Sequence, residues 1–280
     1  MRSLLFAPGG SARMIEKALA GEVDAVILDL EDAVQPAAKE EARARVAEAL
    51  RRPARPRVYV RVNALGTPWC EADIAAVVPL RPHGLMLPKP EGPQDVARLD
   101  ALLAAREPAG ASGATRILAV CTETPAAVLS LASASWRHPR LEGLLWGGED
   151  LSVGLGATAN RDAGAYTSPF RLARDLCLFA ARAAGVLPID AVFTDFRDAD
   201  GLAREAVAAR RDGFAAKAAI HPSQVPVINA AFTPTEAERA WAARVVAALE
   251  GAAAGAVQLD GVMIDAPHLA QARRILAAPQ

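Results

Sequence analysis

The sequence predicts one α/β domain, a closed (β/α)8 barrel of the TIM type, followed by a C-terminal helical extension. Short apolar runs of strand length alternate with helical segments rich in Ala, Leu, Arg and Glu. The repeat from strand to strand is about 30 residues, the size of one βα unit. Eight such repeats favour a closed barrel over an open, Rossmann-like sheet, and a barrel of about 250 residues fits a chain of this length.

The predicted strands are mostly continuous apolar runs, as expected for parallel strands covered on both faces. In order, they are Ser3–Phe6, Ala25–Leu30, Val58–Val62, Gly84–Leu87, Arg116–Cys121, Gly143–Trp146, Ala191–Phe193 and Ala215–Ile220. Apolar residues at helical spacing predict helices between them. These helices are Lys39–Arg51, Asp95–Ala105, Pro125–Ala134, Phe170–Ala184 and Asp198–Arg211. The Pro- and Gly-containing segment Pro108–Ala114 predicts a surface loop before the fifth strand.

The chain continues well beyond the eighth strand, so we divide it into a barrel, residues 1–232, and an extension, residues 233–280. Pro234 opens a predicted helix that reaches about Glu250, and an apolar, glycine-containing stretch, Ala256–Asp265, leads to a final short helix. A segment this short is not expected to form a core of its own. We therefore expect it to cap the barrel or to pack on a neighbouring subunit.

Charge and cysteine content exclude several classes of protein. Lys and Arg number 31 against 32 Asp and Glu, so no overall basic field is available to bind nucleic acid or an anionic membrane. The three cysteines are widely spaced and form no C-x-x-C pair, which indicates a reducing compartment. No apolar run has the length of a signal peptide or of a membrane span. We expect a cytoplasmic protein with neither nucleic acid nor membrane as a partner.

Polar side chains gather at the carboxyl ends of the predicted strands, whereas the opposite ends carry mostly Ala, Val, Gly and helix-terminal Arg. The carboxyl face of a (β/α)8 barrel is the one that holds active sites, so an active site is predicted there. The residues are Asp29, Glu31, Asp32, Arg61, Asn63, Lys89, Glu123, Glu149, Asp150 and His221.

Glu123 and Asp150 follow neighbouring predicted strands, the fifth and the sixth. Two carboxylates without a His or Cys cluster suit a hard cation, Mg2+ or alternatively Mn2+, which keeps waters and substrate oxygens as its other ligands. The alternative is that each carboxylate stabilises the first turn of the helix that follows it. Two acids on adjacent strand ends that face an arginine favour the metal site.

Arg61 stands in an otherwise apolar strand, where a charge needs a partner. Its guanidinium is placed to stabilise an enolate oxygen or a substrate carboxylate. The alternative is a buried ion pair with Asp29 or Glu31, and the two interpretations are compatible.

Ser11 is a predicted N-cap of a helix whose Arg13 and Lys17 lie on one face. Such a helix start can hold phosphates, for example those of coenzyme A, although basic residues on a solvated helix face are equally ordinary. His221, followed by Pro222, is a lone histidine, and we assign it no proton transfer.

Seven motifs resemble those of the citrate lyase beta-subunit-like proteins, within the HpcH/HpaI aldolase group that includes malyl-CoA and citramalyl-CoA lyases. The resemblance runs in order from about residue 2 to about residue 275. The motifs are Arg2–Gly9 (RSLLFAPG), Asp29–Val34 (DLEDAV), Val60–Asn63 (VRVN), Leu87–Lys89 (LPK), Gly148–Leu151 (GEDL), Ala219–Gln224 (AIHPSQ) and Gly261–Pro267 (GVMIDAP).

The resemblance implies a Mg2+-dependent TIM barrel that acts on acyl-CoA or acyl-carrier thioesters, usually as a homotrimer or hexamer. It implies Glu123 and Asp150 as metal ligands and Arg61 as a substrate contact. Asp265 matches a tail aspartate that enters the neighbouring subunit's active site as the proposed acid or base. The residues that match the family's contacts to the CoA thioester are Phe6, Arg13, Lys17, Ile220 and His221.

Two positions depart from the family pattern. Phe6 stands where some relatives have tyrosine, and Ala216 precedes Lys217 where glycine is common. Both bear on the ligand more than on the fold.

The expected function is therefore a Mg2+-dependent carbon–carbon lyase. It cleaves a 3-hydroxyacyl-CoA of the malyl-, methylmalyl- or citramalyl-CoA type into a 2-oxo acid and an acyl-CoA. The alternatives are a citryl-carrier-protein lyase subunit of a citrate lyase complex, a malate-synthase-like or thioesterase variant, and a non-catalytic acyl-CoA-binding barrel. The joint presence of Arg61, Glu123, Asp150 and Asp265 argues against the last.

Overall fold

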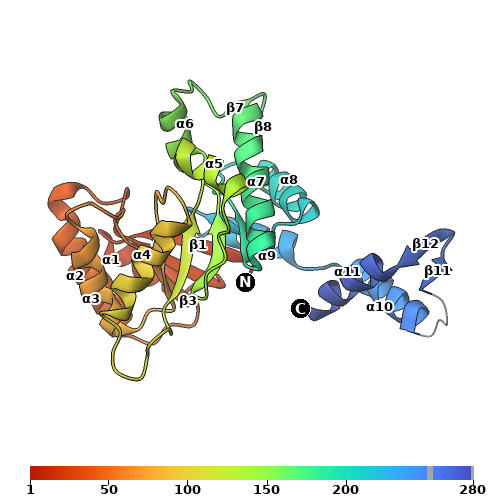
Figure 1. The fold of residues 1–280 in the computed structure, drawn as a ribbon, viewed down its shortest axis with the longest axis horizontal. Helices are drawn as coiled ribbons and strands as arrows, with labels where there is room; N and C mark the ends of the chain where they lie inside the picture. Colours follow the sequence, from red (N-terminus) through yellow and green to blue (C-terminus); the bar gives the residue numbers. More distant parts are fainter. Residues whose placement is uncertain (251–254, 279–280) are drawn as a thin grey trace. The chain divides into compact units, whose positions relative to one another are not determined.

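The computed structural model describes residues 1–250 and 255–278. The chain divides into two compact units, Met1–Asn229 and Ala230–Gln280. In the first unit, eight parallel strands close into a barrel in the order β1-β10-β9-β6-β5-β4-β3-β2. Figure 1 shows helices on both sides of these strands. The predicted (β/α)8 barrel is confirmed, and the open Rossmann-like sheet is excluded because β1 pairs with β10.

Seven of the barrel strands lie where the sequence predicts them, within one or two residues at most ends. The barrel strands are β1 (Ser3–Pro8), β2 (Ala25–Asp29), β3 (Arg57–Arg61), β4 (Gly84–Leu87), β5 (Arg116–Val120), β6 (Leu141–Leu145), β9 (Leu187–Asp190) and β10 (Ala216–Ala219).

The prediction of the seventh strand at Ala191–Phe193 is wrong, because the strand there is β9, four residues earlier. Pro188 lies inside β9, and proline is rare in a central strand since it has no N–H for the ladder. Here its carbonyl still accepts the Ala215 N–H at 3.0 Å. The segment predicted as strand instead leaves the barrel at the carboxyl end of β9.

The predicted helices are also present, and shorter elements that the periodicity did not reveal join them. The helices of the first unit are α1 (Ala12–Leu19), α2 (Lys39–Leu50), α3 (Cys70–Val77), α4 (Pro93–Ala104), α5 (Pro125–Ser133), α6 (Glu149–Leu155), α7 (Ser168–Ala184) and α8 (Ala199–Asp212), with α9 (Gln224–Phe232) running across the boundary between the units. Two 3-10 turns, Pro36–Ala38 and Val78–Leu80, and a hairpin of β7 (Arg161–Asp162) and β8 (Ala165–Tyr166) complete the unit.

Side chains from alternate strand positions fill the barrel interior. Most of them are aliphatic and fully buried, so the barrel is a packed core and not a channel. The buried cluster comprises Leu4, Ala25, Ile27, Tyr59, Met86, Leu118, Val120, Leu145, Ile189, Ala216 and Ala218.

The second unit contains α10 (Glu236–Glu250), the hairpin β11 (Ala256–Leu259) and β12 (Val262–Asp265), and α11 (Ala266–Ala277). The expectation that this segment has no core of its own is wrong. Ala242, Val245, Ile264 and Ala272 form a small buried cluster between the helices and the hairpin. Within residues 1–250 and 255–278, no helix is long and apolar enough to cross a membrane.

A polar cluster lies at the amino ends of the strands, on the face of the barrel opposite the predicted site. Glu142, at the start of β6, accepts hydrogen bonds from Tyr59 Oη at 2.7 Å and contacts His83 Nε2 at 3.0 Å and Arg57 at 3.1 Å. Burial alone would raise the pKa of Glu142, but these partners lower it to about 2. Residues on this face of a barrel contribute to stability.

We therefore expect Glu142→Gln to lower the free energy of unfolding near pH 7 by about 1–2 kcal/mol. The carboxylate stabilises the fold above the unfolded-state pKa of 4.5, and this contribution is lost as the pH falls towards 2. The difference between wild type and variant should accordingly shrink between pH 5 and pH 3 in urea titrations. Glu48→Gln, at an exposed position of α2, is the control, and an equal effect of both variants would contradict the prediction.

Candidate active site at the carboxyl end of the barrel

A cavity of about 220 Å3 opens at the carboxyl ends of the barrel strands. It brings together four residues that were predicted as metal ligands or substrate contacts, Phe6, Arg61, Glu123 and Asp150, from β1, β3 and the segments that follow β5 and β6. The remaining lining residues are Asp32, Val120, Leu145, Trp146, Gly147, Gly148, Glu149, Tyr166, Ala191 and Val192.

Glu123 follows β5 and is almost completely buried. It does not cap the next helix, because Thr124 is the N-cap of α5 and accepts the Ala127 N–H at 3.1 Å. Its Oε2 accepts the backbone N–H of Lys89 at 2.5 Å, whereas no hydrogen bond to Oε1 is found in the described part of the chain. Burial, reinforced by the charge of Asp150, raises the pKa of Glu123 to about 8.

Asp150 lies in the first turn of α6, so the alternative of helix stabilisation holds for this residue in part. Its Oδ1 is 3.3 Å from Lys89 Nζ. Gly147 leaves room beside Glu123, because a Cβ there would lie 3.4 Å from Glu123 Cγ and 3.2 Å from a methyl carbon of Val120. Both carboxylates line the cavity.

Arg61 makes the predicted ion pairs and also lines the cavity. Its Nε and Nη2 donate to the two oxygens of Asp29 at 2.8 and 2.6 Å, and its Nη1 lies 3.0 Å from Glu31 Oε2. The guanidinium carbon is 5.0 Å from the centroid of the Phe6 ring, a cation–π contact. Both interpretations of Arg61 are therefore compatible with its position, and the bidentate pair fixes the direction of the guanidinium.

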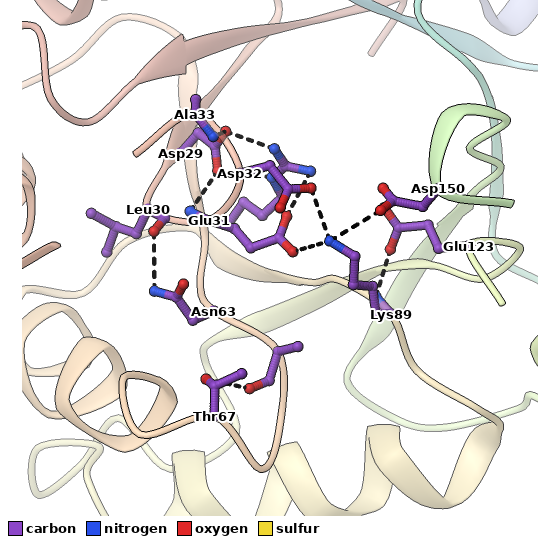
Figure 2. A network of polar contacts seen from close by, with 12 residues as sticks. Asp29, Leu30, Glu31, Asp32, Ala33, Asn63, Thr67, Lys89, Glu123 and Asp150 are labelled. Carbon is purple, nitrogen blue, oxygen red and sulfur yellow. Dashed lines mark hydrogen bonds and ion pairs between the residues drawn. The ribbon is translucent and has the colours of Figure 1, made fainter. Parts of the chain in front are cut away.

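Lys89 lies between the acids that follow β2 and Asp150 in α6, and it contacts both (Figure 2). Its Nζ contacts the Glu31 carboxylate and lies 2.8 Å from Asp32 Oδ2, in addition to its contact with Asp150. Its φ of 50° is left-handed, a conformation that costs a residue other than glycine about 1–2 kcal/mol. Burial raises the pKa of Glu31. Burial would also raise the pKa of Asp32, but Lys89, Arg61 and a hydrogen bond with Glu31 together lower it.

Another part of the cavity lining is aromatic, and a second buried network of hydrogen bonds and ion pairs holds it in place. The rings of Trp146 and Tyr166 pack edge to face, with centroids 4.7 Å apart. Trp146 Nε1 donates to Asp190 Oδ1 at 2.7 Å, and Asp190 Oδ2 is 2.7 Å from Nζ of the fully buried Lys217. The Lys217 ammonium also contacts Glu205 Oε1 at 2.8 Å. The network ties this part of the lining to the barrel.

Sequence reasoning did not identify this aromatic part of the lining. Trp146 stands at the end of a predicted strand, where an aromatic residue is ordinary. Tyr166 lies on the β7–β8 hairpin, whose two-residue strands are too short for a periodic signal. The hairpin turns at Ala163-Gly164, where both residues have positive φ in the structure.

Four other predicted residues are not among those that line the cavity. Arg13 and Lys17 lie on the exposed side of α1, which Ser11 caps as predicted. Ile220 and His221 follow β10, where the His221 ring stacks on Phe196 with centroids 5.0 Å apart. Their assignment to CoA binding stays a prediction.

Asp265 belongs to the second unit, at the N-cap of α11. Its Oδ1 is 2.7 Å from His268 Nδ1, and both side chains are partly exposed. One proton must lie between two atoms at this distance, so His268 keeps the carboxylate oriented. The histidine one turn after Asp265 was the sequence signal for this pair.

The cavity suits a hard cation in its donor set. No group of three His, Cys, Asp or Glu side chains that could share a metal ion is found in residues 1–250 and 255–278. Glu123 and Asp150 would supply two carboxylates, which leaves the other positions of an octahedral ion to water and substrate oxygens. Arg61 provides a fixed positive charge in the same cavity for a developing anion.

Comparison with known proteins gives similarities along the whole chain. Citramalyl-CoA lyase, mitochondrial, from Rattus norvegicus is 34% identical over 296 residues, which cover 98% of this chain and 85% of the rat protein. A (3S)-malyl-CoA thioesterase from Cereibacter sphaeroides is 35% identical over 99% of this chain and 93% of that protein. The crystal structure of protein CitE from Mycobacterium tuberculosis in complex with magnesium, acetoacetate and coenzyme A is 37% identical. It superposes with a TM-score of 0.83 and covers 98% of this chain and 96% of its own.

The model of the HpcH/HpaI aldolase/citrate lyase family matches residues 2–222, which include the whole barrel. The barrel fold and the relatives that match nearly the whole chain agree with this match. The chain belongs to the HpcH/HpaI aldolase/citrate lyase family.

Proposed function

We propose that the chain is a Mg2+-dependent carbon–carbon lyase that cleaves a 3-hydroxyacyl-CoA of the malyl-, methylmalyl- or citramalyl-CoA type. The products are a 2-oxo acid and an acyl-CoA. The observation that carries the proposal is the pair Glu123 and Asp150, which line one cavity with Arg61. The similarity to the rat citramalyl-CoA lyase and to the magnesium- and coenzyme A-bound structure supports this substrate class.

Glu123 and Asp150 would hold the cation. A bound divalent ion would act as a Lewis acid that lowers the pKa of the substrate hydroxyl. Binding of the cation favours the ionised form of Glu123, whose pKa burial raises to about 8. Gly147 leaves the room beside Glu123 that the oxo-acid half of the substrate needs.

In the proposed cleavage, a base removes the proton of the substrate hydroxyl and the C–O bond becomes a carbonyl. The carbon–carbon bond to the α-carbon of the thioester breaks, and its electron pair leaves on the thioester as an enolate. Arg61 stabilises the negative charge, since Asp29 fixes the direction of its guanidinium. Protonation of the enolate at the α-carbon yields the acyl-CoA.

We propose Asp265 as the base, acting on the site of a neighbouring subunit in a homotrimer or hexamer. Two observations support this assignment: Asp265 is part of the second compact unit, and the lining of the cavity comes from the first unit. His268 Nδ1 at 2.7 Å holds the Asp265 carboxylate in one orientation, from which it would take the hydroxyl proton.

A second candidate function is hydrolysis of the thioester, favoured by the similarity to (3S)-malyl-CoA thioesterase. The same cavity residues would serve, but water would attack the thioester carbonyl. The two activities give different products: cleavage yields a 2-oxo acid and an acyl-CoA, whereas hydrolysis yields free CoA and a hydroxy acid.

The test is an assay of the full-length protein with malyl-, methylmalyl- and citramalyl-CoA, with Mg2+ and after chelation by EDTA. We expect release of a 2-oxo acid with at least one substrate, and a loss of at least 100-fold in rate after chelation because a bound cation contributes several kcal/mol. Oxo acid is measured with a coupled dehydrogenase and free thiol with Ellman's reagent. Free thiol without oxo acid would favour the thioesterase, and silence in both assays would contradict the proposal.

A further inference from the structure

Lys89 is a strand-end residue that the proposed mechanism does not use, although it contacts more of the site than any residue in the mechanism. Its backbone N–H donates to Glu123 at 2.5 Å, and its Nζ lies 3.3 Å from Asp150. One residue therefore contacts both proposed metal ligands, one through its main chain and one through its side chain. Lys89 makes both contacts from a left-handed backbone with a φ of 50°.

The Lys89 ammonium also holds two acids that are not proposed ligands. Glu31 and Asp32 follow β2 and contact Nζ from the side opposite Asp150 (Figure 2). Asp32 lines the same cavity as Glu123 and Asp150. If the Lys89 ammonium were absent, the carboxylates of Glu31 and Asp32 would be free to offer oxygens to a divalent ion.

Charge balance in this network is set by few groups. The acids are Asp29, Glu31, Asp32, Glu123 and Asp150, five in number, and Arg61 and Lys89 contact their carboxylates. Lys39 Nζ contacts Glu31 through its backbone carbonyl, at 2.7 Å. Arg61 is engaged by Asp29 and Glu31, so Lys89 is the cation that faces Asp32 and Asp150.

We propose that Lys89 is a fixed counter-ion of the metal site, which keeps Glu31 and Asp32 away from the divalent ion and thereby holds that ion on Glu123 and Asp150. This inference rests on the proposed function, which supplies the metal. It assigns to Lys89 a positioning role that lowers the affinity for the cation and raises activity.

The expected size follows from Coulomb's law. A hard cation lies about 2.1 Å from an oxygen that binds it, so an ion on Asp150 is within about 7 Å of the ammonium. At that distance, one unit of charge changes the affinity for a divalent ion about tenfold, even at the dielectric constant of water. Loss of the ammonium should therefore tighten binding, whereas a residue that only supports the fold would weaken binding when it is replaced.

The experiment is a titration of the full-length protein with Mn2+, with free Mn2+ measured by electron paramagnetic resonance. We expect the Kd of Lys89→Met to be about tenfold lower than that of the wild type, with kcat at least tenfold lower. Lys89→Arg keeps the charge and should have a Kd close to that of the wild type. Arg106→Met, which removes an exposed charge just after α4, is the control for net charge.

A second variant distinguishes the loss of the Lys89 charge from structural damage caused by the substitution. In the Lys89→Met background, Asp32→Asn should raise the Kd back towards the wild-type value, because the released acid is then absent. An unchanged or higher Kd in Lys89→Met, or a wild type that binds no Mn2+, would overturn the inference. A wild type that binds Mn2+ but cleaves no thioester would contradict the proposed function alone, since the Kd values still decide the role of Lys89.

Discussion

Glu123→Gln is expected to lower the metal-dependent cleavage rate by about 1,000-fold or more. The variant keeps the shape of the side chain but supplies no charge to the cation, and Mg2+ then has Asp150 as its single carboxylate among the proposed ligands. The Lys89 N–H can still donate to the amide oxygen, so the local backbone should be retained. The measurement is kcat with saturating substrate over a range of Mg2+ concentrations.

Two further results would identify the cause of this loss. Because the pKa of Glu123 is raised to about 8, cation binding to the wild type near pH 7 should release a proton, and the variant should release less. Calorimetry in buffers of different ionisation enthalpy measures this difference. Glu149→Gln removes another carboxylate of the cavity and should retain more than a tenth of the activity. Full metal-dependent activity in Glu123→Gln would exclude Glu123 from the metal site.

Lys217→Met is expected to destabilise the barrel by about 3–5 kcal/mol, as found when one partner of a buried ion pair is removed. Lys217 is fully buried, and its ammonium contacts Asp190, Glu205 and the carbonyl oxygen of Ala191 at 2.7 to 2.8 Å. Lys217 and Arg174 lower the pKa of Asp190 against the effect of burial. The variant leaves this buried anion with Arg174 and Trp146 and removes the partner of its Oδ2. Urea unfolding followed by far-UV circular dichroism measures the loss.

The double variant Lys217→Met with Asp190→Asn tests whether the unpaired charge is the cause. It should be more stable than Lys217→Met, since the amide can still accept the Trp146 N–H without a buried charge. Arg51→Met, at an exposed pair with Glu48, should change stability by less than about 0.5 kcal/mol. A double variant less stable than Lys217→Met would show that packing, and not charge, dominates.

The fold was predictable because its signals are periodic and repeated. Strands such as Ala25–Asp29 are buried on both faces and read as unbroken apolar runs. The error at β9 came from one residue, Pro188, whose missing N–H makes a central strand improbable from local rules. The core of the second unit was missed because four buried side chains, drawn from two helices and a hairpin, leave no continuous pattern.

The charged residues of the site were predictable from the sequence, but the aromatic residues that line the cavity were not. Arg61, Glu123 and Asp150 stand out because charge at a strand end needs a reason, and all three line the cavity. Trp146 and Tyr166 carry no such signal, since only the tertiary structure brings a strand end and a short hairpin together. The contacts of Lys89 were not predictable either, because its backbone is left-handed and a lysine in the sequence does not indicate that conformation.

The closure of the barrel between β1 and β10 has a consequence for the order of events during synthesis. Ser3 of β1 pairs with Lys217 of β10, so the first barrel strand to be synthesised lacks this partner until the last one is synthesised. At about 5–20 residues per second, that wait on the ribosome is roughly 10 to 40 s. Throughout it, β1 is an open sheet edge, and β9 is a second one from its synthesis until β10 is added. Strands from other chains can add to such edges. A nascent or truncated chain that stops before Ala216 should therefore depend on chaperones, while the finished barrel has no such edge.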